Sequence, residues 1–263
     1  MEEVKIPSFR VDNKVALITG GSRGIGKACA FALANAGAEI IILGRNENKL
    51  AEVHREIENM TTKVLSIPGD LTEISQTPKI VHRILNQFKR IDILVNNAGV
   101  CYREAATDIS EETWNNTMNV NLKGLFFLTK EVAKNMIKDK YGRIINISSM
   151  NSITALVGHA SYNCSKAGLI GLTKVLAMEL GRYGINVNSV SPTFTKTEMA
   201  EHVMQNKNKY NEIIKNIPLG RLAETYDIAA AVLFLASPAA DFITGINLLV
   251  DGGWTTGKEL RNI

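Results

Sequence analysis

A tyrosine and a lysine four residues apart carry the clearest chemistry in this chain. Tyr162 and Lys166 share one face of any helix that spans them, so their side chains come within reach of each other. A free phenol ionises near pH ~10, and an ammonium about 5 Å away, at an effective dielectric constant near ~20, favours the phenolate by roughly 3 kcal/mol. This equals about two pKa units, so we expect Lys166 to lower the pKa of Tyr162 toward the range of acid–base catalysis. Ser149, thirteen residues upstream, would hold the oxygen of a carbonyl or alcohol.

A glycine-rich segment near the amino terminus indicates a phosphate site. Residues 19–26 read Thr-Gly-Gly-Ser-Arg-Gly-Ile-Gly, between a strand-like apolar run and a stretch rich in helix-forming residues. A strand, a glycine turn and a helix start form the phosphate-binding context of a Rossmann unit. The glycines let the backbone approach a pyrophosphate, and the helix N-terminus offers free N–H groups. A merely structural turn is the alternative interpretation.

Strand-like and helix-like segments alternate along the chain, and no linker or repeat interrupts them. The strand-like runs are continuously apolar, as expected of parallel strands buried on both faces. The pattern predicts one α/β domain over residues 1–263, a single-domain Rossmann fold with a doubly wound seven-stranded parallel sheet and helices on both faces. The predicted strands are Val15–Thr19, Ile40–Leu43, Lys63–Ile67, Ile91–Val95, Arg143–Ser148, Asn186–Val190 and Asn247–Val250. The predicted helices are Gly26–Ala36, Glu47–Asn59, Thr77–Phe88, Ser110–Lys138 and Tyr162–Tyr183.

Taken together and in order, these motifs resemble those of the short-chain dehydrogenase/reductase family, in its compact single-domain branch. The resemblance runs from about Asn13 to Gly253. Each motif alone is weak, but their combination is specific. The matching positions are Thr19–Gly26, Asp70, Asn96–Gly99, Asn121, Ser149, Tyr162 with Lys166, and Asn188–Pro192.

The resemblance implies hydride transfer between a nicotinamide cofactor and a carbonyl or secondary alcohol. It makes Tyr162 the general acid or base, Ser149 the hydrogen-bond partner of the substrate oxygen, and Lys166 the group that lowers the Tyr162 pKa and binds the nicotinamide ribose. Asn121 would hold the water that completes a proton relay, and the neighbouring Asn119 is the competing assignment. The cofactor-binding residues that the resemblance implies, besides Tyr162 and Lys166, are Gly20, Ser22, Arg23, Gly24, Ile25, Gly26, Asp70, Leu71, Asn97, Gly99, Thr195 and Thr197.

The charge at the end of the second strand favours NADP(H) over NAD(H). NAD-binding Rossmann units carry an acidic residue there for the adenosine ribose. This chain has Arg45 instead, and Arg23 in the glycine turn adds a second guanidinium. Two guanidinium groups suit a 2′-phosphate. In the alternative, Arg45 faces solvent and the cofactor is NAD(H).

The substrate side is less defined. Residues 193–218, called the lid below, are expected to cover the nicotinamide end. Where the family usually has Pro-Gly, this chain has Pro192-Thr193, which puts the contacts of Thr195 and Thr197 in doubt. Arg103 could meet a substrate carboxylate or simply face solvent. Its surroundings look similar to those of gluconate-type sugar-acid dehydrogenases, and the same framework serves 3-oxoacyl carrier-protein reductases.

Three other functions remain open. The first is an NAD-dependent sugar-acid or polyol dehydrogenase with the same mechanism, and the second is a non-catalytic NADP-binding regulator. The third is a nucleotide-sugar epimerase or dehydratase, which is disfavoured because Arg23 stands at a glycine position and little chain remains for a substrate domain.

Composition excludes several other classes. The net charge is +4 without a basic run, which argues against nucleic acid. No apolar stretch reaches the ~20 residues that span a membrane, and the first ten residues lack a signal-peptide core. Three cysteines without metal-ligand spacing predict reduced thiols, a cytoplasmic location and no metal. From the resemblance we expect a homotetramer, or failing that a dimer.

Overall fold

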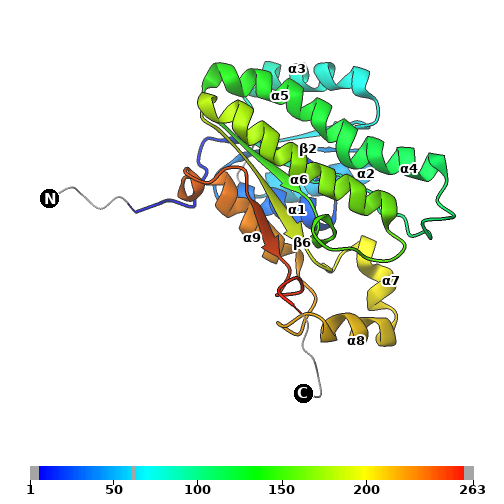
Figure 1. Ribbon diagram of the computed structural model, residues 1–263. Coiled ribbons are helices and arrows are strands. Elements are labelled where there is room, and N and C mark those ends of the chain that lie inside the picture. The colour runs from blue at the N-terminus through cyan, green and yellow to red at the C-terminus, as the bar shows by residue number, and fades with distance from the viewer. Residues whose placement is uncertain (1–5, 61–62, 258–263) are drawn as a thin grey trace.

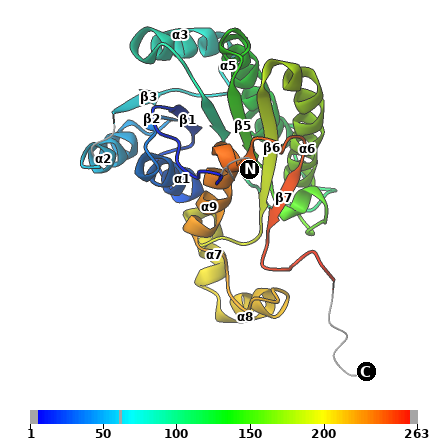
Figure 2. The same cartoon turned by 90° about the vertical axis from the view of Figure 1, so that its left-hand side faces the viewer.

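A seven-stranded parallel sheet forms the centre of the computed structural model, which describes residues 6–60 and 63–257 (Figures 1 and 2). The strand order is β3-β2-β1-β4-β5-β6-β7, so the order reverses between β1 and β4, where open α/β sheets bind ligands. The predicted fold class is confirmed. The strands are β1 Val15–Thr19, β2 Glu39–Gly44, β3 Val64–Pro68, β4 Ile93–Asn96, β5 Gly142–Ile147, β6 Ile185–Pro192 and β7 Asn247–Val250.

Helices cover both faces of the sheet. Alternate residues of one strand point to opposite faces, so Ile40 and Ile42 of β2 pack with α1, α2 and α9, while Ile41 and Leu43 pack on the side of α3, α5 and α6. This two-sided burial explains the continuous apolar runs. The α-helices are α1 Gly24–Asn35, α2 Glu47–Glu58, α3 Thr77–Phe88, α4 Glu111–Met118, α5 Leu125–Asp139, α6 Ala160–Leu180, α7 Glu201–Met204, α8 Lys207–Lys215 and α9 Thr225–Ala236. Short 3₁₀ turns span Ile74–Gln76, Met150–Ser152, Gly181–Tyr183, Glu198–Ala200 and Pro238–Ala240.

The helix predicted over Ser110–Lys138 is interrupted. A π-helical turn, Asn119–Gly124, separates α4 from α5. Gly124 approaches the segment after β3 so closely that a Cβ there would lie 2.4 Å from the carbonyl oxygen of Leu71. The widened turn is the kind of helix defect that often occurs at functional sites, and it contains Asn121. The sequence prediction also omitted α9.

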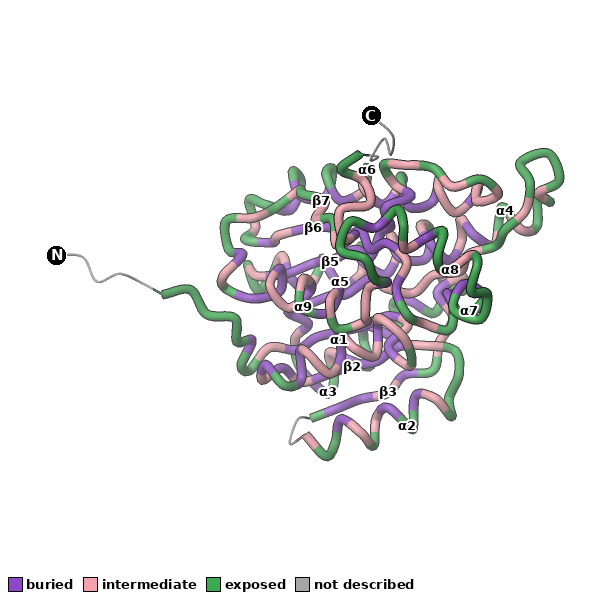
Figure 3. Tube along the Cα trace, turned by 90° about the horizontal axis from the view of Figure 1, so that it is seen from below, coloured by how far each residue is buried: buried purple, intermediate pink, exposed green. Residues whose placement is uncertain are grey.

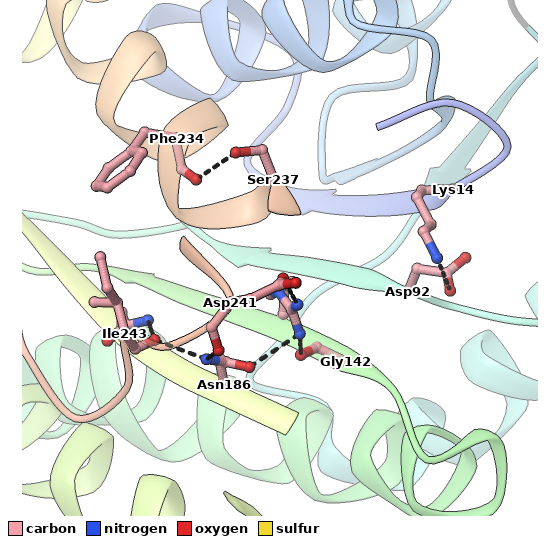
Figure 4. Close-up of polar contacts among 10 residues, drawn as sticks. Lys14, Asp92, Gly142, Asn186, Phe234, Ser237, Asp241 and Ile243 are labelled. Carbon is pink, nitrogen blue, oxygen red and sulfur yellow. Dashed lines mark hydrogen bonds and ion pairs between the residues drawn. The ribbon is translucent and has the colours of Figure 1, made fainter. Parts of the chain in front are cut away.

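Charged side chains are buried at the amino ends of the strands, opposite the ligand-binding edge. Asp92, 2% exposed, accepts hydrogen bonds from the Val15 amide (2.9 Å) and from Arg90. Arg143, at the start of β5, donates to Asn186 and pairs with Asp241 at 2.5 Å (Figure 4). These contacts tie β1, β4, β5 and β6 together at the end where no chemistry is predicted.

The lid extends beyond the carboxyl ends of the strands. It carries α7 and α8, which lie outside the helical layers (Figures 1 and 2), and much of their surface is exposed (Figure 3). Its inner side packs around Val203, Ile213, Ile217 and Leu222, with Trp254 against Phe194 at a ring-centroid distance of 5.6 Å. Among the described residues, no helix combines the length and the hydrophobicity that crossing a membrane requires.

Candidate active site

A cleft of about 2620 Å³ lies between the carboxyl ends of the strands and the lid. Its walls are formed by the glycine turn, the segments after β2 to β6, the start of α6 and the lid. The volume exceeds the ~300–1,000 Å³ typical of pockets for one drug-sized molecule. The cleft therefore has room for a dinucleotide and a second ligand.

Ser149, Tyr162 and Lys166 converge in this cleft. Ser149 follows β5, and Tyr162 and Lys166 lie in the first two turns of α6. Lys166 Nζ donates to the carbonyl oxygen of Ile147 at 2.8 Å and lies 5.7 Å from the centroid of the Tyr162 ring. Ser148 donates its hydroxyl to the Lys166 carbonyl (2.9 Å), which fastens α6 to the end of β5. The register of strand and helix thus sets the position of all three polar groups.

The pKa of Tyr162 shifts in the direction opposite to the one expected from the sequence. Burial raises the pKa of the Tyr162 phenol, and the Ser149 hydroxyl acts in the opposite direction. Burial also lowers the pKa of Lys166 to about 8. The expected lowering of the Tyr162 pKa by Lys166 is therefore absent, because burial dominates and the Cys101 thiol also raises this pKa. A lysine with a pKa of about 8 is still about nine-tenths protonated at pH 7.

Asn121 is fully buried and fastens the loop after β4 to the helices. Its Oδ1 accepts from the Val100 amide (2.8 Å), and its Nδ2 donates to the Val100 carbonyl (2.9 Å) and to Ser165 Oγ (3.1 Å). Gly99 lies between Asn121 and Lys166, and a Cβ there would be 3.3 Å from Asn121 Oδ1 and 3.5 Å from Lys166 Nζ. The loop, the π-helical turn and α6 therefore meet around the lysine.

The glycine turn has the geometry of an anion cradle. Gly20 and Gly24 have φ of +63° and +53°, which favour glycine. The N-cap residue of α1, Arg23, gives no side-chain hydrogen bond to the first turn, so the N–H groups there remain open to an anion. Ser22 and Ile25 line the cleft beside them. Gly26 does not line it; a Cβ at Gly26 would lie 2.2 Å from the Gly20 carbonyl oxygen, so this glycine serves close packing.

One acidic and one basic residue that were predicted to bind the cofactor, Asp70 and Arg45, lie near each other. Asp70 Oδ1 accepts from the amide and hydroxyl of Thr72 (2.8 and 2.9 Å), and Asp70 Oδ2 is 4.0 Å from Arg45 Nη1. Arg45 is 65% exposed, so this ion pair is weak and its guanidinium remains available. Leu71 is buried and lines the cleft.

The structure adds two charged residues that the sequence analysis missed. Lys49, in the first turn of α2, and Glu198, in the lid, form an ion pair of 2.9 Å. Glu198 also pairs with Arg23. The Asn46 cap, which accepts from the Lys49 amide (2.9 Å), fixes the start of α2. Lys49 follows the helix-capping Asn46 by three residues, and this spacing in the sequence places Lys49 in the first turn of the helix after β2.

Asn97 supports the turn as well as lining the cleft. Its Nδ2 donates to the carbonyl oxygens of Thr19 (2.9 Å) and Gly20 (3.2 Å), so its amide holds the glycine turn in place. The neighbouring Asn96 points into the core, where its Nδ2 donates to Thr129 Oγ1 and Asn146 Oδ1, each at 2.8 Å.

Threonine at position 193 is accommodated without backbone strain. Asn13, Lys89 and Lys140 are the non-glycine residues with positive φ in the described ranges, and Thr193 is not among them. Its hydroxyl contacts Met150 Sδ at 3.1 Å. Thr195 and Thr197 line the cleft, and their hydroxyls donate to the carbonyls of Thr193 (3.0 Å) and Thr195 (3.3 Å). The segment therefore keeps the two threonines at the cleft.

Arg103 lies on the substrate side of the cleft. It is exposed, and its side chain forms no hydrogen bond or ion pair with any residue in the described ranges. Glu104 N donates to the Gly158 carbonyl (2.9 Å), and a Cβ at Gly158 would lie 3.3 Å from Arg103 Cγ. The loop that carries Arg103 is thus held against the segment just before Tyr162.

The site residues fit a nicotinamide dinucleotide. The glycine turn and the open N-terminus of α1 suit a pyrophosphate, and the cations Arg23, Arg45 and Lys49 suit a further anionic group. No group of three metal-ligating side chains occurs in the described part of the chain.

Several known proteins are similar to this chain over most of its length. A family model described as enoyl-(acyl carrier protein) reductase matches residues 20–255. The chain is 37% identical to the 2-dehydro-3-deoxy-D-gluconate 5-dehydrogenase of Dickeya dadantii, covering 94% of this chain and 97% of that one. It is 40% identical to the NAD-dependent glycerol dehydrogenase of Listeria innocua (94% and 96% covered) and 38% identical to the 3-oxoacyl-[acyl-carrier-protein] reductase of Thermotoga maritima (93% and 99%).

A solved structure shares the whole fold. The gluconate 5-dehydrogenase of Burkholderia cenocepacia, crystallised with NADP and tartrate, superposes with a TM-score of 0.92 at 36% identity, covering 95% of this chain and 98% of that one.

Proposed function

We propose that this chain, which belongs to the short-chain dehydrogenase/reductase family and is an oxidoreductase of that family, uses NADP(H) to interconvert a carbonyl and a secondary alcohol. The observation that carries the proposal is the convergence of Ser149, Tyr162 and Lys166 beside the glycine turn, in one cleft. A non-catalytic regulator would have no need of this arrangement.

The four candidate catalytic residues take distinct roles. When bound, the nicotinamide supplies or accepts the hydride. Tyr162 transfers a proton to or from the substrate oxygen, and Ser149 holds that oxygen by a hydrogen bond. Lys166 places a positive charge 5.7 Å from the centroid of the Tyr162 ring and would bind the nicotinamide ribose. Asn121 holds the loop after β4 beside Lys166 by accepting from the Val100 amide, and it contacts α6 by donating to Ser165 Oγ.

The charges at the adenosine end support NADP(H). Arg23, Arg45 and Lys49 all line that end of the cleft, and the one nearby carboxylate on the sheet edge, Asp70, is engaged by Thr72 and Arg45. Guanidinium groups bind phosphate through paired hydrogen bonds. The Burkholderia relative was crystallised with NADP, whereas the Listeria relative is named NAD-dependent, so relatives of both kinds exist.

Cofactor preference is tested by exchanging one cation. In Arg45→Asp a carboxylate replaces a phosphate partner, so NADPH should bind at least tenfold more weakly while NADH changes little. Dissociation constants for both cofactors, from the fluorescence of the reduced nicotinamide, give the comparison. Tighter binding of NADH than of NADPH by the unaltered enzyme contradicts the proposal.

A carboxylate-bearing substrate is favoured by Arg103. Arg103 lines the cleft and forms no ion pair within the described ranges, and such a cation suits a carboxylate at the far end of a substrate. This is the chemistry of a sugar acid, the substrate class named for the Dickeya relative. Arg103→Ala should raise KM for gluconate-type acids at least tenfold and leave KM for neutral carbonyls nearly unchanged. Equal effects on both substrate classes contradict the assignment.

The free cysteines support a cytoplasmic location. Cys29, Cys101 and Cys164 are all unpaired, as expected in a reducing compartment.

A further inference from the structure

Glu198 of the lid bridges two cations of the cofactor cleft. Its Oε2 pairs with Arg23 of the glycine turn, and its Oε1 accepts from Lys49 Nζ at 2.9 Å. Both hydrogen bonds lower the pKa of the Glu198 carboxyl, that to Lys49 the more, so it is ionised near neutral pH. A carboxylate of the chain itself therefore engages Arg23 and Lys49, two cations that line the cleft.

The position of Glu198 is set by the first part of the lid. Thr195 pairs with Ala223 in a short parallel bridge, and the amide of Lys196 donates to the Ala223 carbonyl at 2.8 Å. Thr197 then lies over the glycine turn, since a Cβ on Gly24 would be 3.2 Å from Thr197 Cγ2. Contacts with Ala223 and with the glycine turn hold residues 195–197 in place, so the residue that follows, Glu198, reaches Arg23 and Lys49.

We propose that Glu198 is an internal competitor of the 2′-phosphate, and that its carboxylate tunes the preference of this enzyme between NADP(H) and NAD(H). The inference rests on the proposed role of the cations at the adenosine end in binding that phosphate. A phosphate that takes Arg23 and Lys49 must displace Glu198 from both. A cofactor without the phosphate leaves the bridge intact, so Glu198 weakens NADP(H) binding and leaves NAD(H) binding nearly unchanged.

The expected size of the effect follows from exposure. Arg23, Lys49 and Glu198 are 59%, 42% and 51% exposed, so solvent weakens both ion pairs. Two pairs of the strength typical of exposed sites correspond to roughly a two- to thirtyfold change in a dissociation constant. The carboxylate therefore moderates the preference rather than determining it alone.

Glu198→Gln keeps the size and polarity of the side chain and removes its charge. The test uses two soluble probes that differ only in the 2′-phosphate, adenosine 2′,5′-bisphosphate and adenosine 5′-monophosphate, with affinities measured by titration calorimetry. We expect the variant to bind the bisphosphate about two- to thirtyfold more tightly than the unaltered enzyme and the monophosphate equally. Glu201→Gln is the matched control, because it removes one charge from the same lid at a residue whose carboxylate bonds Gln205 instead.

A double-substitution cycle identifies the cation involved. In Lys49→Met the carboxylate has lost one partner, so adding Glu198→Gln should improve bisphosphate binding by less than it does in the unaltered background. The salt dependence should agree, with the gain from Glu198→Gln shrinking as ionic strength rises.

Three outcomes overturn the inference. They are an unchanged bisphosphate affinity in Glu198→Gln, an equal gain in Glu201→Gln, and weaker binding of both probes, which would make Glu198 a support of the closed lid. The proposal of NADP(H) as cofactor is judged separately, by whether the unaltered enzyme prefers NADPH to NADH. An unaltered enzyme that prefers NADH, with a bisphosphate gain in Glu198→Gln, would refute that proposal and retain this inference.

Discussion

Tyr162 is the proposed proton donor to the substrate oxygen, and burial raises the pKa of its phenol. Tyr162→Phe retains the ring and deletes the proposed proton donor. General acid–base catalysis typically supplies ~10²–10⁴-fold, so kcat/KM should fall by at least about a hundredfold. Steady-state kinetics with NADPH and a carbonyl panel measure this, and the NADPH dissociation constant serves as the control, since it should change little.

Ser149→Ala tests whether the serine acts on the same oxygen. We expect it also to reduce turnover strongly, and the double variant with Tyr162→Phe to lose much less than the sum of the two free energies, because both groups serve one atom. Additive losses would indicate that the residues act at separate steps.

Lys166 should make stability depend on pH in a defined window. Its native pKa of about 8 lies below the ordinary lysine value of 10.5, so between these values the unfolded state binds more protons. The free energy of unfolding therefore rises with pH across that window, by about 1–2 kcal/mol between pH 7.5 and 9.5. Urea unfolding at several pH values should show this rise in the unaltered chain and in the control Lys174→Met, which changes an exposed lysine of the same helix. The rise should be absent in Lys166→Met.

Between elements, the amino ends of β1 and β4 depend on Asp92. Its carboxylate accepts from the Val15 amide and from Arg90 and lies 4.0 Å from Lys14 Nζ (Figure 4). Asp92→Ala leaves a buried amide without its acceptor and breaks the ion pair with Arg90, whose side chain is 42% exposed, so we expect a loss of about 1–3 kcal/mol in the free energy of unfolding. Urea unfolding measures it, with Asp12→Ala as control. Asp12 is half exposed and pairs with exposed Arg10, so its replacement should change the free energy of unfolding far less.

At the scale of the whole molecule, one exposed apolar surface supports the homotetramer. Met178 on α6 is 84% exposed and Phe242 is fully exposed. The two segments that carry them are adjacent, since a Cβ on Gly245 would lie 3.4 Å from the Ala177 Cβ. Beside them runs β7, the edge strand, whose free side is open to pairing. By contrast, Leu125 and Leu128 of α5 are buried in the core of the chain itself and add nothing to this surface.

We predict a tetramer in solution, held partly by this surface. Light scattering at micromolar concentration should give four times the mass of the chain, or twice for a dimer, and Met178→Asp should lower it because a charge would enter an apolar interface. Tyr226→Asp, which alters an exposed aromatic residue on α9, is the control and should leave the mass unchanged. A monomer would contradict the assembly.

The sequence by itself determined the features that depend on local pattern. Continuous apolar runs predicted the strands of a sheet buried on both faces, and the spacing of the glycines, serine, tyrosine and lysine predicted the candidate site. These features follow from neighbours along the chain, so local pattern is sufficient to predict them.

Only the tertiary structure decided how distant segments meet. The sequence predicts one continuous helix over Ser110–Lys138, but the folded chain has a π-helical turn there, at the point where Gly124 approaches Leu71 closely. Desolvation, which depends on everything packed around a group, raised the pKa of Tyr162 although the nearby lysine alone predicted the opposite. Glu198 meets Lys49 across 149 positions of sequence, and no local pattern encodes such a contact because the folded lid creates it.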